Sequence, residues 1–238
     1  MLVEVLGLLL WFLLFTRLHA AAGKDVVAAT AHALTLQSAE HALHLDIERS
    51  ANNWLAGRPL LGHLAVYLYR FYYVAVAGVL LWAFVRNADV YRHARRTLVA
   101  MTALVLPVYW AVPMSPPRFV LPGVVDIVAR YDILSHTSRD TGNGQNHYSA
   151  MPSLHVGWSL WSAYVAWSVL RPTHPRLALL PWAFPLLMTA DVLTTGNHYV
   201  LDVAGSVVLM FVAIATATLW GRLARARARS LHSEQQTA

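Results

Sequence analysis

The 238-residue sequence contains no cysteine, and charged residues make up only 13% of it. The absence of cysteine excludes disulfide bonds and thiolate metal sites, and it leaves the redox compartment open. Soluble domains contain about 25% charged residues. With 57% hydrophobic residues, this composition argues against a soluble globule and for a membrane protein.

The apolar residues gather into blocks of roughly 18 to 24 residues, the length that a helix needs to cross about 30 Å of hydrocarbon. We predict an all-α, polytopic membrane helical bundle of about six transmembrane helices, with an additional N-terminal amphipathic surface helix. The first block has Glu4 and no Lys or Arg before its apolar core, which favours an uncleaved span over a signal peptide. The predicted spans are 2–22, 62–85, 98–113, 152–170, 177–193 and 198–219.

We expect one integral membrane domain. Residues 1–60 form the first span and the surface segment, 61–221 the catalytic bundle, and 222–238 a basic and polar tail. Between residues 25 and 58, apolar and polar residues alternate at helical spacing, which predicts an amphipathic helix on the membrane surface with a solvated polar face. A metal site is the alternative explanation of that face. The apolar positions are Leu36, Ala39, Leu43 and Ile47, the polar ones Gln37, Glu40, His44 and Glu48, and the alternative ligands His41, His44, Asp46 and Glu48.

Arginines cluster after the second, fourth and sixth predicted spans. Because basic loops stay in the cytoplasm, both termini are expected there, in a plasma-membrane protein. Arg17 and Lys24, at the outer end of the first span, favour the opposite orientation. The net charge of +6 is spread over loops and tail, so no nucleic-acid partner is expected.

With this topology, three polar clusters fall at the outer membrane face: 116–118, 152–155 and 198–202. His198 and Asp202 are four residues apart and share one face of a helix. A carboxylate that binds one imidazole nitrogen fixes the tautomer and leaves the other nitrogen free to attack. Helix packing is the alternative role for the pair, but ionisable groups near the end of a span are usually functional.

Four more residues are candidates for the same site. His155 follows a proline suited to a helix start, so Ser153 and free backbone donors lie near it and suit an anion. A second histidine facing His198 can act as general acid for a poor leaving group. Arg118 offers a forked guanidinium for phosphate oxygens, with a role as interfacial anchor as the alternative. Arg70, inside the second span, is a further candidate phosphate ligand.

Together, the Pro-Ser-Leu-His segment at 152–155 and the His-Tyr-x-x-Asp segment at 198–202 resemble the type 2 phosphatidic acid phosphatase superfamily. The likeness extends over about residues 107–219. It implies a helical bundle with its site at the outer face, in which His198 becomes phosphorylated, Asp202 orients it and His155 is the general acid. No cofactor and no metal are implied.

The sequence departs from the phosphatase pattern at three positions. Ala111 and Val192 stand where phosphatases have a lysine and an arginine, and Leu154 stands where they usually have glycine. The chain is therefore more similar to the branch that contains inositol phosphorylceramide synthases and sphingomyelin synthases.

We expect a phosphotransferase or phosphatase that acts on a lipid or prenyl phosphate through a phosphohistidine, with water, a polar alcohol or a lipid alcohol as acceptor. A plain lipid phosphate or prenyl-diphosphate phosphatase is the alternative enzyme. A non-catalytic lipid-binding or transport protein is the alternative from another class. The loop 119–150 is expected to hold acceptor specificity, with the candidate residues Asp126, Arg130, Asp132, Arg139, Asp140 and His147. Its Thr-Gly-Asn-Gly stretch at 141–144 is a turn signal that fits a lid hinge or an ordinary loop.

Overall fold

The computed structural model describes residues 2–131 and 146–237, and within these ranges the chain is helical without named strands. The expected all-α membrane bundle is confirmed. The predicted specificity residues Asp132, Arg139 and Asp140 and the turn at 141–144 lie outside the described ranges. The elements are α1 (Leu2–Ala21), α2 (Val26–Ala42), α3 (Glu48–Ala56), α4 (Pro59–Arg86), α5 (Ala88–Ala111), α6 (Pro117–Val120), α7 (Ile127–Tyr131), α8 (Leu154–Leu170), the 3₁₀ helix η2 (Leu177–Trp182), α9 (Ala183–Thr194) and α10 (Val200–Thr237).

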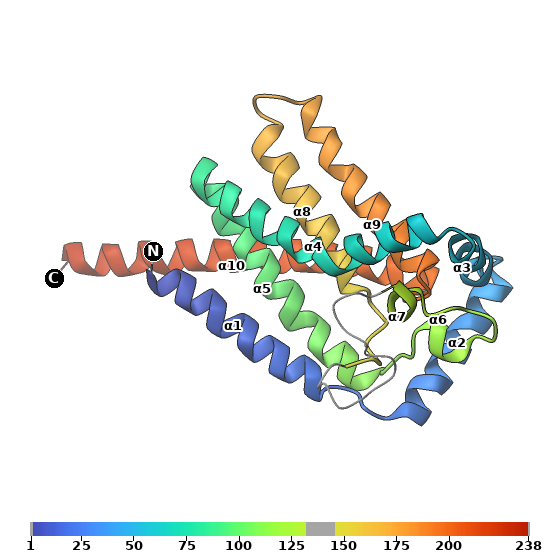
Figure 1. The fold of residues 1–238 in the computed structure, drawn as a ribbon. Coiled ribbons are helices and arrows are strands. Elements are labelled where there is room, and N and C mark those ends of the chain that lie inside the picture. The colour runs from blue at the N-terminus through green and yellow to red at the C-terminus, as the bar shows by residue number, and fades with distance from the viewer. Residues whose placement is uncertain (1, 132–145, 238) are drawn as a thin grey trace.

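The long helices form a bundle in which α10 packs along α5 and α8, α4 packs on α5 and α8, and α1 packs on α5. The hairpin of α8 and α9 extends from one flank (Figure 1). The start of α1 and the end of α10 lie on the same side of the molecule, whereas the short helices α2, α3, α6 and α7 gather on the opposite side (Figure 1).

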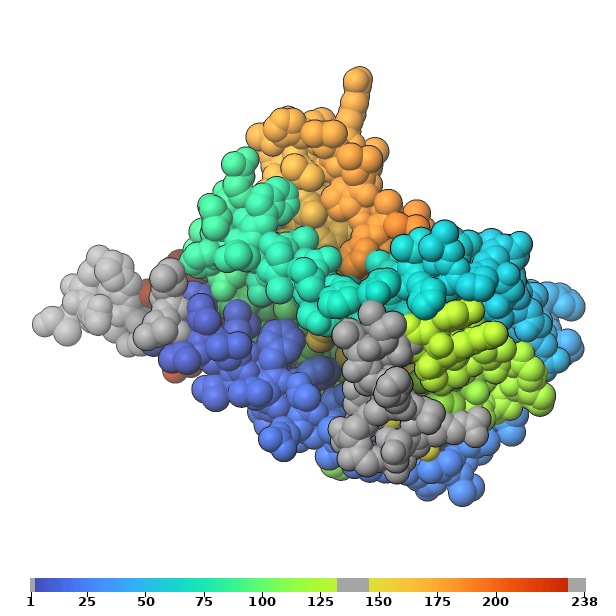
Figure 2. Space-filling view, viewed as in Figure 1, coloured from blue at the N-terminus to red at the C-terminus, as the bar shows by residue number. Residues whose placement is uncertain are grey.

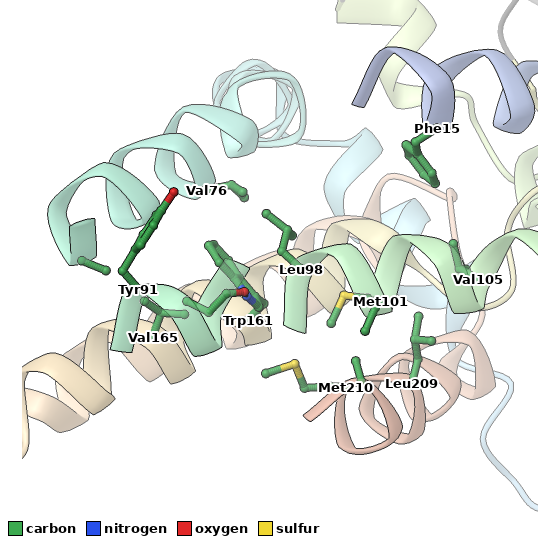
Figure 3. Packing of buried hydrophobic residues seen from close by; sticks show 14 of the residues in the cluster. Phe15, Val76, Tyr91, Leu98, Met101, Val105, Trp161, Val165, Leu209 and Met210 are labelled. Atoms are coloured by element: carbon green, nitrogen blue, oxygen red, sulfur yellow. The ribbon is translucent and has the colours of Figure 1, made fainter. Parts of the chain in front are cut away.

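The core lies where α5, α8 and α10 meet. Trp161 of α8 is fully buried, and its indole N–H donates to the carbonyl oxygen of Ala94 on α5 at 3.0 Å. Met101 of α5 and Leu209 and Met210 of α10 pack in the same cluster (Figure 3). This packing fixes α8 relative to α10. Of the two predicted catalytic histidines, His155 lies in the first turn of α8 and His198 just precedes α10.

Among the described residues, four segments are long and apolar enough to cross a membrane: Val3–Ala21, Pro59–Arg86, Leu177–Thr194 and Val200–Ser230. At most a third of the most apolar stretch of each is buried inside the bundle, as expected for helices that face lipid. The other two predicted spans form helices α5 and α8. Because α8 has 17 residues and α5 carries Arg92, Arg95 and Arg96 in its first half, the six-span count stays a prediction.

The predicted surface segment differs from expectation in two ways. It forms two helices, α2 and α3, separated at His44, whose φ of 57° breaks the helix. Leu43 and Ile47 are exposed, as predicted for an interfacial apolar face. However, the polar face is not solvated throughout, because Glu40 and Glu48 are 0% and 1% exposed. The prediction was wrong for these two residues because their carboxylates accept hydrogen bonds from the start of α10.

Candidate active site

His198 lies on a tight connection between α9 and α10. Gly196 adopts φ of +74°, a conformation that favours glycine. A side chain there would also meet Val124 and Asn52, with Cβ 2.7 Å from Val124 Cγ1 and 3.2 Å from Asn52 Nδ2. The backbone N–H groups of Asn197 and His198 donate to the carbonyl oxygen of Val192, at 3.0 and 3.2 Å. The connection therefore holds His198 in one backbone conformation.

Among the described residues, the imidazole of His198 is hydrogen-bonded through Nδ1. This nitrogen lies 2.8 Å from the carbonyl oxygen of Ala150 and 3.2 Å from Oδ2 of Asp202. A carbonyl oxygen accepts but cannot donate, so these contacts favour the neutral tautomer with its proton on Nδ1 and a lone pair on Nε2. The shorter of the two contacts comes from a backbone carbonyl, which the spacing of His198 and Asp202 did not predict.

Asp202 is fully buried at the first turn of α10. Besides contacting His198, its Oδ2 accepts the backbone N–H of Tyr199 at 2.9 Å. Its backbone oxygen accepts the Ser206 hydroxyl at 2.7 Å, and the same hydroxyl is 2.8 Å from the carbonyl oxygen of Ser153. These bonds connect the start of α10 to the start of α8.

His155 lies in the first turn of α8 and faces His198, with 6.2 Å between the two ring centroids. Two tyrosines of α4 hold its ring. Tyr69 stacks on it at 4.1 Å and Tyr72 contacts it at 4.4 Å, measured between centroids. The structure thus brings together two histidines that are 43 positions apart in the sequence.

Arg118, at the start of α6, lies beside His198. One guanidinium N–H donates to the side-chain oxygen of Asn197, and Nε is 3.3 Å from Oδ2 of Asp126. Asn197 immediately precedes His198, so the arginine is held at the level of the imidazole. Asp126, which we expected only in a specificity loop, instead fixes Arg118.

Ser153 occupies a different place from the one predicted. It is fully buried and caps α8, where its hydroxyl oxygen accepts the N–H of Val156 at 3.4 Å. It is not among the residues that line the cavity next to His198. Its contribution is therefore to the position of α8, together with the bond from the Tyr109 hydroxyl to the carbonyl oxygen of Pro152 at 2.8 Å.

A cavity of about 530 Å³ opens beside the two histidines. Residues of α1 and α4 line it, and these two helices lie on the same face of the molecule (Figure 2). Arg70 and Arg118 both border this space, which gives it a cationic wall suited to phosphate oxygens. The predicted site residues on its wall are His155, His198, Arg118 and Arg70.

The cavity is also lined by His19, Asn146 and Ser149, which the sequence did not suggest. His19, near the end of α1, lies 3.0 Å from the hydroxyl of Ser149 through Nε2, and Asn146 donates to the backbone oxygens of His19 and Ala22. His147, a candidate from the predicted specificity loop, lines the cavity as well, and burial and the charge of Arg118 lower its pKa, which favours its neutral form. The position of His19 beside Thr16 and Arg17, at the end of an otherwise apolar span, is the sequence feature that could have pointed to it.

Two of the departures from the phosphatase pattern have structural consequences. Val192 is fully buried in an apolar cluster with Val156 and Met188, so that position packs the helix and does not face the cavity. Leu154 lines the cavity beside His155 and adds an apolar surface. Among the described residues, no group of three or more His, Cys, Asp or Glu side chains is placed to hold a metal ion.

Comparison with known proteins supports the resemblance seen in the motifs. Neither the curated proteins nor the solved structures gave a match. A family model described as the PAP2 superfamily matches residues 34–216, a longer stretch than the motifs alone suggested, since it includes most of α2 and all of α3. The chain therefore belongs to the PAP2 superfamily, whose members act as phosphatases and phosphotransferases of lipid phosphates, and it is an integral membrane protein.

Proposed function

We propose that the protein is a phosphotransferase that moves the phosphoryl-containing headgroup of a lipid or prenyl phosphate to an alcohol, through a phosphohistidine on His198 at the extracytoplasmic face. The observation that carries the proposal is the binding of His198 through Nδ1, with the His155 ring opposite. A nucleophile needs a free lone pair, and an alkoxide leaving group needs a proton donor.

In the first step, Nε2 of His198 attacks phosphorus and the bond from phosphorus to the lipid oxygen breaks. His155 gives its proton to that departing oxygen. In the second step, the oxygen of the acceptor hydroxyl attacks the phosphohistidine, its proton passes to His155, and the phosphorus–nitrogen bond breaks. Asp202 stabilises the imidazolium that forms on His198, and Arg118 and Arg70 balance the charge on the phosphoryl oxygens.

The size and lining of the cavity favour transfer over hydrolysis. A cavity of about 530 Å³ falls within the range of about 300–1,000 Å³ that small-molecule sites occupy. Its polar wall of His19, Asn146 and Ser149 faces the space beside the histidines. Hydroxyl and amide groups of this kind can orient an acceptor alcohol through hydrogen bonds.

The test is incubation of the purified protein with phosphatidate, a prenyl diphosphate and phosphatidylinositol, each with and without a lipid alcohol. Phosphate or inositol phosphate released into water and phosphate transferred to the acceptor are measured separately. We expect a phosphorylated acceptor that is absent with His198→Ala: a phosphomonoester from phosphatidate or the prenyl diphosphate, or a phosphodiester from phosphatidylinositol. His174→Ala, a change of an exposed histidine in the loop after α8, serves as the matched control and should leave turnover unchanged.

The outcomes separate the candidate functions. Free phosphate formed equally with and without acceptor makes the protein a hydrolase and overturns transfer. Lipid phosphate that binds but is never cleaved makes it a binding or transport protein and overturns catalysis.

A further inference from the structure

Helix α10 begins without a capping side chain of its own. The first N–H groups of a helix need acceptors, which a short polar residue before the helix usually provides. Tyr199 precedes α10 and cannot fill that role. The N–H of Val200 instead donates to Oε1 of Glu48 at 3.2 Å, and that of Leu201 donates to Oε1 of Glu40 at 2.6 Å.

These two carboxyl groups are far from α10 in the sequence, and both are buried. Glu40 lies in α2 and Glu48 begins α3, and their exposed fractions are 0% and 1%. A buried carboxyl group costs free energy unless its oxygens are bonded. The two carboxyl groups hydrogen-bond to each other and also accept the N–H groups at the start of α10, and these bonds together lower the cost of burial.

The same two helices also hold the connection that precedes His198. Asn52 of α3 is fully buried, and its amide group donates to the carbonyl oxygens of Thr194 at 3.0 Å and Val125 at 2.9 Å. Its side-chain oxygen accepts the N–H of Val125 at 2.7 Å. Helices α2 and α3 thus bind the chain on both sides of His198.

Resting on the function proposed above, we infer that Glu40 and Glu48 are positioning residues for His198. By taking the N–H groups of Val200 and Leu201, they fix the first turn of α10 and leave Asp202 available to the imidazole. Neither residue lines the cavity, so they act on the nucleophile through the helix and do not touch substrate.

The protonation of the pair supports this role. Burial, together with the facing carboxyl groups of Glu48 and Asp202 and against the hydrogen bond from the Leu201 N–H, raises the pKa of Glu40 to about 8. Burial also raises the pKa of Glu48, which additionally faces Asp46. Tyr199 is the other titratable group near both. Near neutral pH Glu40 is therefore protonated, and deprotonation near pH 8 adds negative charge beside Asp202.

The first experiment measures kcat and KM of the purified full-length protein with the best substrate from the assay above. The double change Glu40→Ala/Glu48→Ala removes both acceptors, and we expect kcat to fall by about 100-fold, the scale of a misplaced catalytic group. KM should change by less than about two-fold because substrate contacts are intact. Asp89→Asn removes an exposed carboxylate in α5 and is the control, with no expected effect. A double variant with wild-type kcat overturns the inference.

The second experiment compares pH profiles, and it uses a substitution that keeps an oxygen acceptor. We expect kcat of the wild-type protein to fall near pH 8, where Glu40 loses its proton. Glu40→Gln resembles the protonated acid, so it should retain kcat at pH 6.5 and show no such fall. A purely structural role would lower the melting temperature and leave the profile in place. The same fall near pH 8 in Glu40→Gln overturns the inference.

A third measurement does not depend on turnover. Hydrogen exchange of a peptide that covers residues 199–203 should be at least about ten-fold faster in the Glu40→Ala/Glu48→Ala variant, because two amide bonds are lost. Peptides from α5 should be unchanged. If wild-type protein cleaves no lipid phosphate, the proposed function fails, and exchange alone decides whether these carboxyl groups hold the helix. Unchanged exchange overturns the inference.

Discussion

The two ends of α10 have opposite surroundings. At its start, Asp202 and Ser206 are fully buried, and their polar groups bond to α8 and to the connection after α9. At its end, Arg225, Arg227 and Arg229 are all exposed. One helix thus has an end whose geometry is fixed by groups from four other segments and an end at which three neighbouring arginines are exposed. Substitutions at the first end should affect activity and stability, and those at the other end should affect neither.

The largest effect is expected from Asp202→Asn. The amide loses the negative charge that stabilises an imidazolium on His198, and it can present a donor to Nδ1 in place of an acceptor. Comparable changes in catalytic triads cost about 10,000-fold in kcat, and we expect at least about 1,000-fold here because the Ala150 carbonyl still binds Nδ1. Turnover with the substrate found above, at equal amounts of folded protein, measures it.

Asp191→Asn is the matched control for that change. Asp191 is also a buried aspartate, on α9, but it does not line the cavity, and its carboxylate oxygens have no hydrogen-bond partner among the described residues. It should keep wild-type turnover. Asp202→Asn with more than about a tenth of wild-type kcat would contradict the role of Asp202.

The second largest effect is expected from Gly196→Ala, which tests the backbone that leads into the start of α10. A left-handed conformation costs a residue other than glycine about 1–2 kcal/mol. The new methyl group would also overlap Val124. We expect the free energy of unfolding in detergent to fall by about 2–4 kcal/mol, with turnover reduced because His198 shifts.

Gly78→Ala controls for the loss of a glycine. Gly78 lies in α4 with no atom within 4 Å of the added methyl group. The free energy of unfolding of the Gly78→Ala variant should be unchanged or slightly increased, because alanine favours the helical conformation. Equal effects of the two substitutions would show that the connection before His198 is not constrained.

A smaller effect is expected from pH. Because the pKa of Glu40 is raised above its ordinary value of 4.5 to about 8 in the folded protein, the folded state binds a proton more tightly than the unfolded state. The stability from this group is fully present below pH 4.5 and is lost as pH rises to 8. The melting temperature should fall across this range, and less so in Glu40→Gln. An identical slope in both proteins would contradict a raised pKa at Glu40.

The sequence predicted the parts of this comparison that depend on local pattern. Hydropathy located the long helices. The spacing of His198 and Asp202 predicted that their side chains meet, and they lie 3.2 Å apart, but His198 precedes α10 and does not share a helix face with Asp202. It could not predict Glu40 and Glu48 as partners of α10. Their polar positions on an amphipathic helix are equally compatible with solvent, and the hydrogen bonds that bury them join residues more than 150 positions apart. The sequence also could not show that Ser153 lies away from the cavity, because the same hydroxyl can bind a phosphate or cap a helix. In the structure its oxygen accepts the N–H of Val156 and caps α8.

The smallest effect is expected at the far end of α10. Replacing Arg225, Arg227 and Arg229 together by glutamine keeps the length and helix preference of the side chains while removing three charges. Exposed substitutions away from packed or bonded groups change stability by about 0.5 kcal/mol or less. We expect unchanged melting temperature and turnover at neutral pH. A loss of turnover close to that of Gly196→Ala would mean that the basic end acts on the site through the helix, and the contrast between the two ends would not hold.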